Sequence, residues 1–490
     1  MTNNHTMVQY FEWNLPNDGF FWKRCAAQAG RLKEYGIDMA WLPPAYKGTF
    51  NGDTGYGAYD LYDLGEFDQK GTIRTKYGTK EEYIDAVLTL QQAGISVLAD
   101  IVLNHKLGAD ACEEVLVTQD SDENRNTQIS GTQKILAWTK FNFEGRHNTY
   151  SDFKWNYTHF SGTDWDDRGK KKGIFLFNGK TWNRKTDDEK GNYDYLMGAD
   201  LDTDNPEVIL ETKRWAEWYY QTVHMDGFRL DAVKHISADF YKDWIATIRK
   251  KTGRELFMVG EYWHTQTKHL LNYLDEMENS LSLFDVPLHF NLLHASTQNG
   301  GFDMRGLFSD TLLSQRPDQA VTFVDNHDTQ PGQALCSFIP EWFKQSAYAA
   351  ILLRQDGLPC VFYGDLYGIS ASGVRPVENL KKLIKIRSLF AYGTQYDYMD
   401  HESIVGFTRT GDEAHKDSGL AVLLTDTIHG CKKMKVGTKW TGQKFYDALG
   451  HCTQPVMIDE NGEGIFGVSD GSVSVWVSEP AYKLLEIEME

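Results

Sequence analysis

The chain has 490 residues, more than one hydrophobic core usually holds, which predicts about three domains. Its 41% hydrophobic and 24% charged residues are typical of a globular protein in water. The net charge of −19 disfavours nucleic acid and anionic membranes as partners, whereas a neutral polymer is compatible with it.

The six cysteines lie far apart, without the CxxC spacing of zinc sites, so we expect free thiols. The N-terminal segment MTNNHTMVQYFEW has neither the basic region nor the long apolar region of a signal peptide. No run of 18 apolar residues occurs along the sequence. These features predict a cytoplasmic protein, unless a signal peptide has been removed.

From residue 8 onward, strand-like apolar runs alternate with segments of helical periodicity, the pattern of a parallel α/β fold. Gly36 ends one predicted helix, and Thr79 forms a capping box with Glu82 at the start of another. The predicted strands of this first part are 8–11, 37–44 and 96–105, and the predicted helices are 21–35 and 80–94.

The alternation breaks between residues 106 and 205, where the chain is polar and rich in Gly, Asn, Asp and Trp. About 100 residues is too long for a loop between a strand and a helix, so we predict an inserted small β-rich domain over 106–205. In a (β/α)8 barrel such loops emerge at the functional face, and we expect the insert to lie there.

The alternation resumes with a helix whose first residue is Pro206, a favoured position for proline. The further predicted strands are 227–232, 257–263, 283–290, 321–328 and 358–365, and the further helices are 206–223, 238–251, 304–315, 341–355 and 377–392. With the first three strands, these complete a (β/α)8 TIM barrel formed by residues 1–105 and 206–393. Beyond residue 393, seven short runs alternate apolar and polar residues, which predicts a C-terminal antiparallel β-sandwich over 394–490.

Three of the predicted strands end on a carboxylate: Asp231 in GFRLDAVKH (227–235), Glu261 in GEYW (260–263) and Asp328 in VTFVDNHD (321–328). The ends of barrel strands are where the chemistry of this fold takes place. Three acids at one barrel mouth provide a nucleophile, a proton donor and a charge stabiliser, as glycoside cleavage requires. The four polar residues of DNHD (325–328) follow an apolar strand, which a binding site explains better than a core.

Each of these signals is weak alone. Arg229 shares a strand face with Asp231 and its charge favours an ionised nucleophile, although a structural ion pair is the commoner explanation. Glu261 precedes two bulky aromatic residues, and partial desolvation suits a general acid. His105 ends the third strand and is placed to donate to a sugar hydroxyl, although a lone histidine is more often structural. Because all lie at predicted strand ends, we interpret them as one site.

Asp200, Asp202 and Asp204 resemble the start of a calcium loop where the insert rejoins the barrel. Asn205 replaces the glycine that such a loop requires and the preceding segment is not helical, so we reject a helix–loop–helix site. Two interpretations stay open: oxygen ligands for a hard cation, or acids that complement the dipole of the following helix.

The motifs DIVLNH (100–105), GFRLDAVKH (227–235), GEYW (260–263) and FVDNHD (323–328) resemble those of the α-amylases. The similarity is greatest to the bacterial liquefying type and its cytosolic relatives, and it covers nearly the whole chain from residue 8. It implies a (β/α)8 barrel, an insert after the third strand and a C-terminal Greek-key sandwich. It also implies endo-hydrolysis, with retention, of internal α-1,4-glucosidic bonds in starch, glycogen or maltodextrins.

The resemblance further implies a role for each site residue. Asp231 is expected to be the nucleophile, Glu261 the acid/base and Asp328 the stabiliser of the transition state. The expected substrate contacts are Tyr56 stacked on a sugar ring, His105, Arg229 and His327 at the cleavage subsite, and Lys234, His235 and Trp263 on the leaving-group side.

The family also implies a structural calcium ion, held here by Asn104, Asp194, Asp200 and the backbone carbonyl of His235. Secreted relatives bind additional cations with further acids, but this chain has Ser161, Asn183 and Ser403 at the corresponding positions. Since too few carboxylates remain for a multi-cation cluster, we predict one Ca²⁺ rather than three.

Two other functions stay open from sequence: a related enzyme such as a maltogenic hydrolase or glucanotransferase, and a catalytically inactive glucan-binding protein. The three intact acids argue against the second. The expected partner is an α-glucan polysaccharide or oligosaccharide, with no nucleic acid and no membrane, and the chain is expected to be a monomer. A cytoplasmic location favours glycogen or maltodextrin over starch. The tail PAYKLLEIEME (480–490) matches no expected element.

Overall fold

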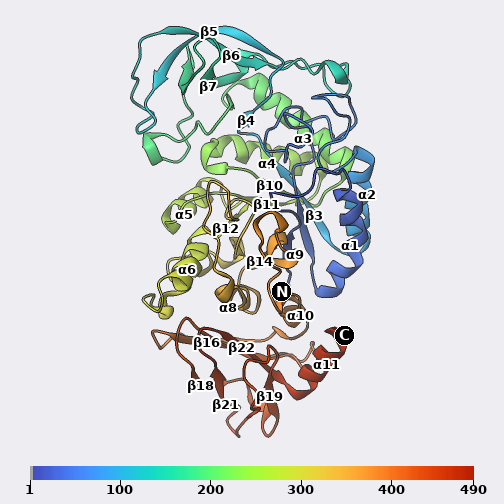
Figure 1. Cartoon of the computed structure of the whole chain (residues 1–490), viewed down its shortest axis with the longest axis vertical. Helices are drawn as coiled ribbons and strands as arrows, with labels where there is room; N and C mark the ends of the chain where they lie inside the picture. Colours follow the sequence, from blue (N-terminus) through green and yellow to red (C-terminus); the bar gives the residue numbers. More distant parts are fainter. Residues whose placement is uncertain (1–3, 490) are drawn as a thin grey trace.

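The computed structural model describes residues 4–489. The chain forms an inserted β-sheet at one end, a central barrel, and a pair of sheets at the other end (Figure 1). Residues 1–3 and residue 490 lie outside the described residues. The first three belong to the predicted barrel domain and to the N-terminal segment from which the location was predicted, and residue 490 belongs to the predicted sandwich.

Within the described chain, eight parallel strands close into a barrel in the order β1-β14-β13-β12-β11-β10-β3-β2. They are β1 (Met7–Gln9), β2 (Met39–Leu42), β3 (Ser96–Ile101), β10 (Gly227–Leu230), β11 (Phe257–Gly260), β12 (Ser282–Phe284), β13 (Ala320–Phe323) and β14 (Leu358–Phe362). The predicted (β/α)8 fold class is therefore confirmed.

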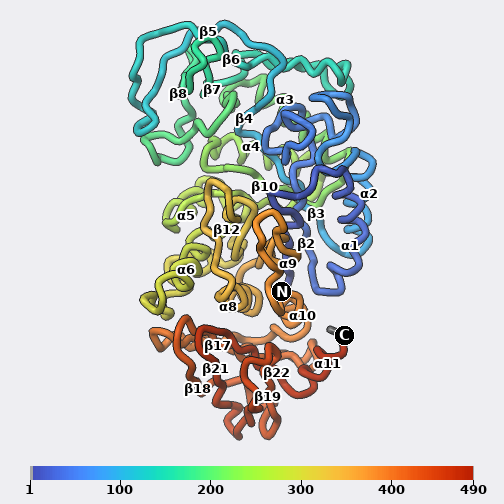
Figure 2. The backbone as a smooth tube through the Cα atoms, in the orientation of Figure 1, coloured from blue at the N-terminus to red at the C-terminus, as the bar shows by residue number. Residues whose placement is uncertain are grey.

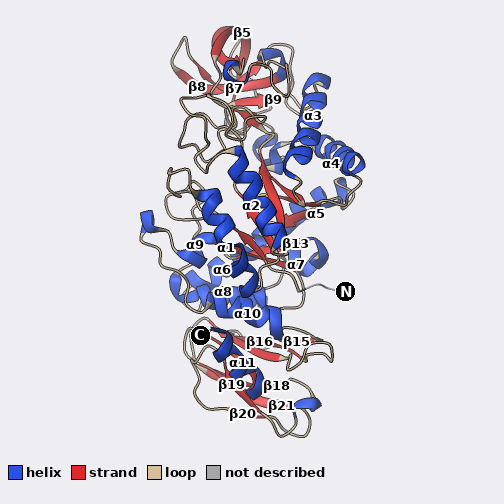
Figure 3. Cartoon of the chain, turned by 90° about the vertical axis from the view of Figure 1, so that its right-hand side faces the viewer, coloured by secondary structure: helices blue, strands red, loops and turns tan. Residues whose placement is uncertain are grey.

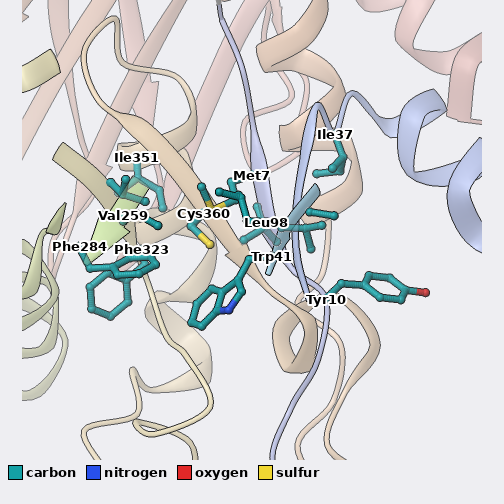
Figure 4. Packing of buried hydrophobic residues seen from close by; sticks show 14 of the residues in the cluster. Met7, Tyr10, Ile37, Trp41, Leu98, Val259, Phe284, Phe323, Ile351 and Cys360 are labelled. Atoms are coloured by element: carbon teal, nitrogen blue, oxygen red, sulfur yellow. The ribbon is translucent and has the colours of Figure 1, made fainter. Parts of the chain in front are cut away.

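The barrel strands are buried on both faces, because side chains fill the interior and helices cover the outside. Figure 4 shows Met7, Trp41, Leu98, Phe323 and Cys360, which come from five different strands, in the interior packing. This filled interior fixes the strand ends, and hence the residues that follow them, relative to one another.

Helices surround the barrel (Figure 3). They are α1 (Phe21–Tyr35), α2 (Lys80–Gln92), α3 (Pro206–Val223), α4 (Ala238–Thr252), α5 (Thr267–Glu276), α6 (Val286–Thr297), α7 (Leu312–Gln315), α8 (Glu341–Leu352), α9 (Tyr363–Tyr367) and α10 (Leu380–Phe390). The predicted capping box is present: the Thr79 N–H donates to Glu82 Oε2 at 3.0 Å, and the Glu82 N–H donates to Thr79 Oγ1 at 3.4 Å. The helix predicted to begin at Pro206 does begin there.

The strand predicted over 283–290 is wrong for most of its length, because β12 ends at Phe284 and α6 begins at Val286. Asp285 stops the strand: its buried carboxylate accepts the Leu288 N–H at 3.1 Å and caps α6. Pro287 fits the first turn of a helix, where its missing N–H leaves no bond unmade.

The continuous helix predicted over 304–315 is also wrong. A 3₁₀ turn covers Met304–Gly306, and α7 begins only at Leu312. Asp310 lies between them with φ at 53°, a left-handed conformation that no helix continues through. Thr311 then caps a new start by accepting the Ser314 N–H at 3.1 Å.

The chain leaves the barrel after β3 and returns at α3, as the tube in Figure 2 shows. The intervening residues form a sheet in the order β4-β9-β7-β8-β5-β6 with its own apolar core. Its strands are β4 (His105–Lys106), β5 (Ala111–Asp120), β6 (Gln133–Lys140), β7 (Phe160–Asp166), β8 (Lys171–Phe177) and β9 (Ala199–Leu201). The predicted insert of short strands after the third barrel strand is thus present.

The C-terminal part packs a sheet of order β15-β16-β17-β22-β19-β20 against the pair β18-β21 around a shared core. The strands are β15 (Gln395–Tyr398), β16 (Ile404–Arg409), β17 (Leu420–Thr425), β18 (Gly430–Lys435), β19 (Lys444–Asp447), β20 (Val456–Met457), β21 (Glu463–Val468) and β22 (Val473–Ser478). The unassigned tail forms α11 (Glu479–Met489), which buries Ala481 and Leu485 and contacts α10, β19 and β22. No described helix combines the length and apolar character needed to cross a membrane.

Asp285 connects two helices, because it also accepts the Leu312 and Leu313 N–H groups of α7 at 3.1 and 2.7 Å. We predict that Asp285→Ala lowers the free energy of unfolding by about 2–4 kcal/mol, since three buried N–H donors lose their acceptor. The measurement is the midpoint of the barrel transition in differential scanning calorimetry. Asp303→Ala removes an exposed cap of one 3₁₀ turn and is the matched control, with an expected loss below about 1 kcal/mol. Equal losses for the two variants would contradict this account.

Candidate active site

The three strand-end acids meet at one mouth of the barrel. Asp231 directly follows β10, Glu261 directly follows β11, and Asp328 lies in the loop after β13. All three line one cleft of about 640 Å³. The cleft also contains six of the residues predicted to contact substrate: Tyr56, His105, Lys234, His235, Trp263 and His327. The fold thus brings together predicted site residues that lie up to 272 positions apart in the sequence, from 56 to 328.

Arg229 lies beneath this cleft and is 1% exposed. One terminal nitrogen donates to Asp231 Oδ1 at 2.6 Å and to Asp100 Oδ1 at 3.0 Å, and the other donates to Glu261 Oε2 at 2.7 Å. The predicted pairing of Arg229 with Asp231 is present, but the same guanidinium also holds Glu261. A single rigid fork thus sets the relative position of two strand-end acids.

The cluster has more carboxylates than positive charges, since the single guanidinium of Arg229 contacts the carboxylates of Asp100, Asp231 and Glu261. Burial raises the pKa of Asp231 to about 7, although the Arg229 charge opposes the shift. Burial and the nearby charge of Glu261 raise the pKa of Asp328 well above its usual value. Arg229 therefore favours the ionised form of Asp231, as the sequence predicted, but burial has the larger effect on the pKa of this carboxyl.

An aromatic wall forms one side of the cleft. The Tyr56 ring stacks on His327 with centroids 4.9 Å apart, and on Trp13 with centroids 5.7 Å apart. The Tyr56 hydroxyl donates to Asp100 Oδ2 at 2.6 Å, which fixes the ring over the acids. Such a rigid flat face suits the apolar C–H surface of a ring-shaped ligand.

The cleft histidines are neutral hydrogen-bonding groups. Burial lowers the pKa of His327 well below its usual value, and the Gln9 amide donates to its Nδ1 at 3.0 Å. The proton is then on Nε2, which lies 3.3 Å from Asp328 Oδ2. Burial likewise lowers the pKa of His235 to about 3, and its Nδ1 contacts the Tyr193 carbonyl at 2.7 Å, so its Nε2 is an acceptor.

His105 differs from the donor expected from sequence. Its Nδ1 lies 3.1 Å from Asn104 Oδ1 and its Nε2 lies 3.0 Å from the Tyr56 carbonyl. Burial lowers the pKa of His105 to about 4, so the neutral ring has a single N–H, which one of these two acceptors takes. Donation to a ligand would require that N–H to leave its protein acceptor.

Lys234 also lines the cleft. Its Nζ donates to Glu189 Oε2 at 2.7 Å and to the Trp263 carbonyl at 3.0 Å. Glu189 belongs to the insert, so this ion pair joins the insert to the segment after β10, and the bond to the Trp263 carbonyl extends the connection to the loop that follows Glu261.

Two of the polar residues in DNHD (325–328) serve structure rather than the cleft. Asp325 is buried and accepts from Lys344 Nζ at 2.5 Å. Asn326 accepts the Asp328 N–H at 2.8 Å and so shapes the turn that presents Asp328. The structure places His327 and Asp328 in the cleft, as the sequence predicted, whereas Asp325 and Asn326 form hydrogen bonds within the protein.

Sequence reasoning missed Asp100, which is fully buried and accepts from Arg229, Tyr56 and Trp41. Its signal was a carboxylate inside an apolar strand, which requires buried partners. It also missed Trp13, which follows the first strand and obeys the same strand-end rule as the acids.

The residues predicted to hold a cation also lie together. Asn104 Nδ2 donates to the His235 carbonyl at 3.1 Å, and Asp194 and Asp200 are buried to within 2% and 1% exposure. Burial raises the pKa of Asp194 to about 7, and burial with the Asp194 charge raises that of Asp200 well above its usual value. Among the described residues, Asp200 Oδ2 has no hydrogen-bond partner. Two buried acids with an unpartnered oxygen fit a divalent cation with oxygen ligands.

Asn183 lies beside these buried acids and donates hydrogen bonds to one of them. Its backbone N–H donates to Asp194 Oδ2 at 2.8 Å, and its Nδ2 donates to Asp194 Oδ1 at 3.2 Å. The neutral Asn183 therefore satisfies the Asp194 carboxylate with hydrogen bonds. An acid at position 183 would instead add a negative charge and require a further cation.

The family profile described as "Alpha amylase, catalytic domain" matches residues 28–389, and "Alpha-amylase C-terminal" matches residues 420–477. An α-amylase of Bacillus licheniformis is 52% identical over 97% of this chain and 93% of its own length. The cytoplasmic α-amylase of Escherichia coli K12 is 42% identical over 97% of this chain and 99% of its own length. The solved structure of an Anoxybacillus α-amylase superposes with a TM-score of 0.65 at 16% identity, covering 97% of this chain and 98% of that one, and so supports the fold.

Proposed function

The chain belongs to the α-amylase family of glycoside hydrolases, and we propose that Asp231, Glu261 and Asp328 carry out its cleavage of internal α-1,4-glucosidic bonds with retention of configuration. The observation that carries this proposal is the Arg229 guanidinium, which holds Asp231 and Glu261 on its two terminal nitrogens at 2.6 and 2.7 Å in one cleft. The family relationship provides the reaction, and the geometry supports the assignment of its residues.

In the first step, the ionised Asp231 attacks the anomeric carbon while the bond to the leaving glucosyl oxygen breaks. Glu261 gives its proton to that oxygen, so the shorter glucan leaves as a neutral alcohol. In the second step, Glu261 takes a proton from water, which displaces Asp231 and restores the original configuration. Asp328, with its oxygen near His327 Nε2, hydrogen-bonds the sugar hydroxyls and stabilises the positive charge of the transition state.

The spacing of the acids supports retention. Retaining glycosidases hold their two carboxyl groups about 5–5.5 Å apart, whereas inverting enzymes separate them by about 6.5–9.5 Å to admit a water molecule. Arg229 binds one oxygen of each carboxylate on its two neighbouring terminal nitrogens, which keeps the two acids close together. A close pair of acids is compatible with direct attack by Asp231.

The remaining residues of the cleft bind the glucan. Tyr56 stacks on the ring at the cleavage subsite, where Arg229 and His327 orient the acids and the sugar hydroxyls, and His105 supports the Tyr56 loop. Lys234, His235 and Trp263 lie on the leaving-group side. Since His235 and His327 stay neutral, they hydrogen-bond hydroxyl groups without adding charge to the cleft.

The two catalytic roles predict different chemical behaviour. Glu261→Gln should lower kcat on soluble starch by roughly 10²–10⁴-fold, but it should still react with maltosyl fluoride, whose leaving group needs no protonation. The glycosyl group should then remain on Asp231, because glutamine cannot activate water. Peptide mass spectrometry measures the adduct, and added azide should release it as the α-glycosyl azide.

Two variants control this experiment. Asp231→Asn should form no adduct and show nearly no turnover, whereas Glu255→Gln, with a side chain 91% exposed outside the cleft, should behave like the unaltered protein. An adduct on another residue, or a β-configured first product, would overturn the assignment.

Asp100 is a positioning residue in this proposal, and it should move the pH profile. Its negative charge raises the pKa of Asp231, so Asp100→Asn should lower that pKa. Because the reaction needs ionised Asp231, the acid limb of kcat/KM should shift to lower pH by roughly 0.5–1 unit. Loss of an Arg229 partner should also reduce kcat by roughly 10–100-fold. Asp243→Asn, at an exposed ion pair, should change neither; an unshifted acid limb in Asp100→Asn would contradict this role.

We further propose one structural Ca²⁺ held by Asn104, Asp194, Asp200 and the His235 carbonyl. The unpartnered Asp200 oxygen supports the site, and the Asn183 hydrogen bonds support a single ion. Such an ion would supply the positive charge that two buried carboxylates require. It would also fasten the insert to the loop after β10, since the ligands come from both.

Calcium removal tests this site. Chelation should lower the melting temperature, and re-addition should restore it with one Ca²⁺ per chain by metal analysis. Asp200→Asn should remove the calcium dependence, whereas Asp204→Asn, an exposed acid on the same loop, should keep it. Three tightly held cations, or a calcium response that survives in Asp200→Asn, would refute the single site.

A cytoplasmic location, a monomeric state and a preference for glycogen or maltodextrin stay predictions. The relative named as cytoplasmic α-amylase, matched over 97% of this chain, supports the location. Fractionation of the native host followed by an activity assay measures it, and activity secreted by intact cells would contradict it.

A further inference from the structure

We propose that Asp187, His264 and His269 form a second metal site, selective for a divalent transition cation of the Zn²⁺ class, at the leaving-group side of the cleft. The candidate ligand atoms of these three residues all lie within 4.8 Å of one another. Asp187 is buried and the two histidines are partly exposed, so the cluster is accessible from solvent.

The three residues come from separate parts of the fold. Asp187 lies in the insert between β8 and β9, His264 lies in the loop after β11, and His269 is on α5. His269 Nδ1 is 3.5 Å from Asp187 Oδ2. An ion at this position would therefore connect the insert to the barrel segment that carries Glu261.

The ligand chemistry distinguishes this site from the proposed calcium site. Two imidazole nitrogens and one carboxylate oxygen suit Zn²⁺ and its neighbours, whereas Ca²⁺ prefers oxygen ligands alone. Three protein ligands leave the remaining position to a water molecule. The calcium residues Asn104, Asp194 and Asp200 offer only oxygen ligands and are not part of this cluster.

Hydrogen bonds from the protein already fix the Asp187 carboxylate, as is usual for carboxylates that bind metals. Its Oδ2 accepts the Tyr262 hydroxyl at 2.5 Å, and its Oδ1 accepts the Glu189 N–H at 2.8 Å. Its side chain has 0% exposure. These outer hydrogen bonds fix the direction in which the carboxylate faces the two histidines.

The two imidazoles must rearrange to share an ion. Their rings stack with centroids 3.8 Å apart and planes at 21°, and lone pairs lie in the ring planes, so one ring has to turn. His264 can turn because it is partly exposed and borders the 640 Å³ cleft, while His269 borders a side cavity of about 240 Å³. In this turn, His264 gives up the hydrogen bond that its Nδ1 accepts from the Gln266 N–H at 3.0 Å.

The local charges do not exclude a cation. Lys185 and Lys234 lie nearby, but Lys185 pairs with Asp239 at 2.6 Å and Lys234 pairs with Glu189 at 2.7 Å. Asp188 and Glu276 also line the side cavity. Lys268 lines the side cavity as well. A divalent ion therefore enters a region of mixed charge, in which Lys185 and Lys234 already have acidic partners.

Isothermal titration of Zn²⁺ into the calcium-saturated full chain tests the proposal. We expect one Zn²⁺ per chain, and His269→Gln and Asp187→Asn should each weaken binding by at least about tenfold. X-ray absorption of the complex should show two imidazole ligands, and Zn²⁺ should raise the melting temperature only where the site is intact. Melting curves without Zn²⁺ check that the variants remain folded.

His429→Gln is the matched control, because His429 forms an exposed histidine–aspartate pair with Asp470 at 2.9 Å but has no third ligand in the cluster. It should bind Zn²⁺ like the unaltered chain. Zn²⁺ binding that is unchanged in both cluster variants, or that only displaces calcium, would overturn the site. Neither result affects the proposed hydrolysis, which is measured without Zn²⁺.

Discussion

The buried guanidinium of Arg229 is the interaction on which the active site depends. A charge with 1% exposure is stable only with close partners, and Arg229 finds Asp100, Asp231 and Glu261 at the ends of three adjacent strands. The order β3, β10, β11 in the barrel makes these strands neighbours. Closure of the barrel thus sets the acid geometry.

Hydrogen bonds connect the Arg229 guanidinium to the residues that line the cleft. Asp100 links Arg229 to Trp41 inside the barrel and to Tyr56 at its mouth, so one carboxylate couples the packed core to the aromatic face of the cleft. Gln9 and Tyr193 set the tautomers of two cleft histidines that burial keeps neutral.

The sequence was informative where local pattern and global fold agree. Apolar runs that end on Asp231 and Glu261 predicted both their strands and their shared location, because parallel strand ends meet at one face. It failed where one side chain overrides the pattern. Asp285 turns an apolar segment from strand to helix through hydrogen bonds to residues 3, 27 and 28 positions away, and no periodicity reveals partners at such distances.

The same limit explains the partial success in the site. Sequence motifs grouped the cleft residues, but they do not show which side chains already have protein partners. Both nitrogens of His105 lie against protein oxygens, and Asp325 accepts from Lys344. The motifs also do not reveal the burial that outweighs the Arg229 charge and raises the pKa of Asp231. Occupancy and charge depend on contacts across strands, and only the assembled barrel determines them.

The insert supplies a further constraint, because several of its polar contacts with the barrel lie near the cleft. Glu189 pairs with Lys234, Asp187 accepts from Tyr262, and the Tyr193 carbonyl meets His235. Each barrel partner lies within four residues of Asp231 or Glu261. Any ion that binds Asp194 and Asp200, or Asp187, therefore acts on the same loops that present Asp231 and Glu261. The acidic side chains at the boundary of the insert thus affect the geometry of the cleft as well as the contact between the insert and the barrel.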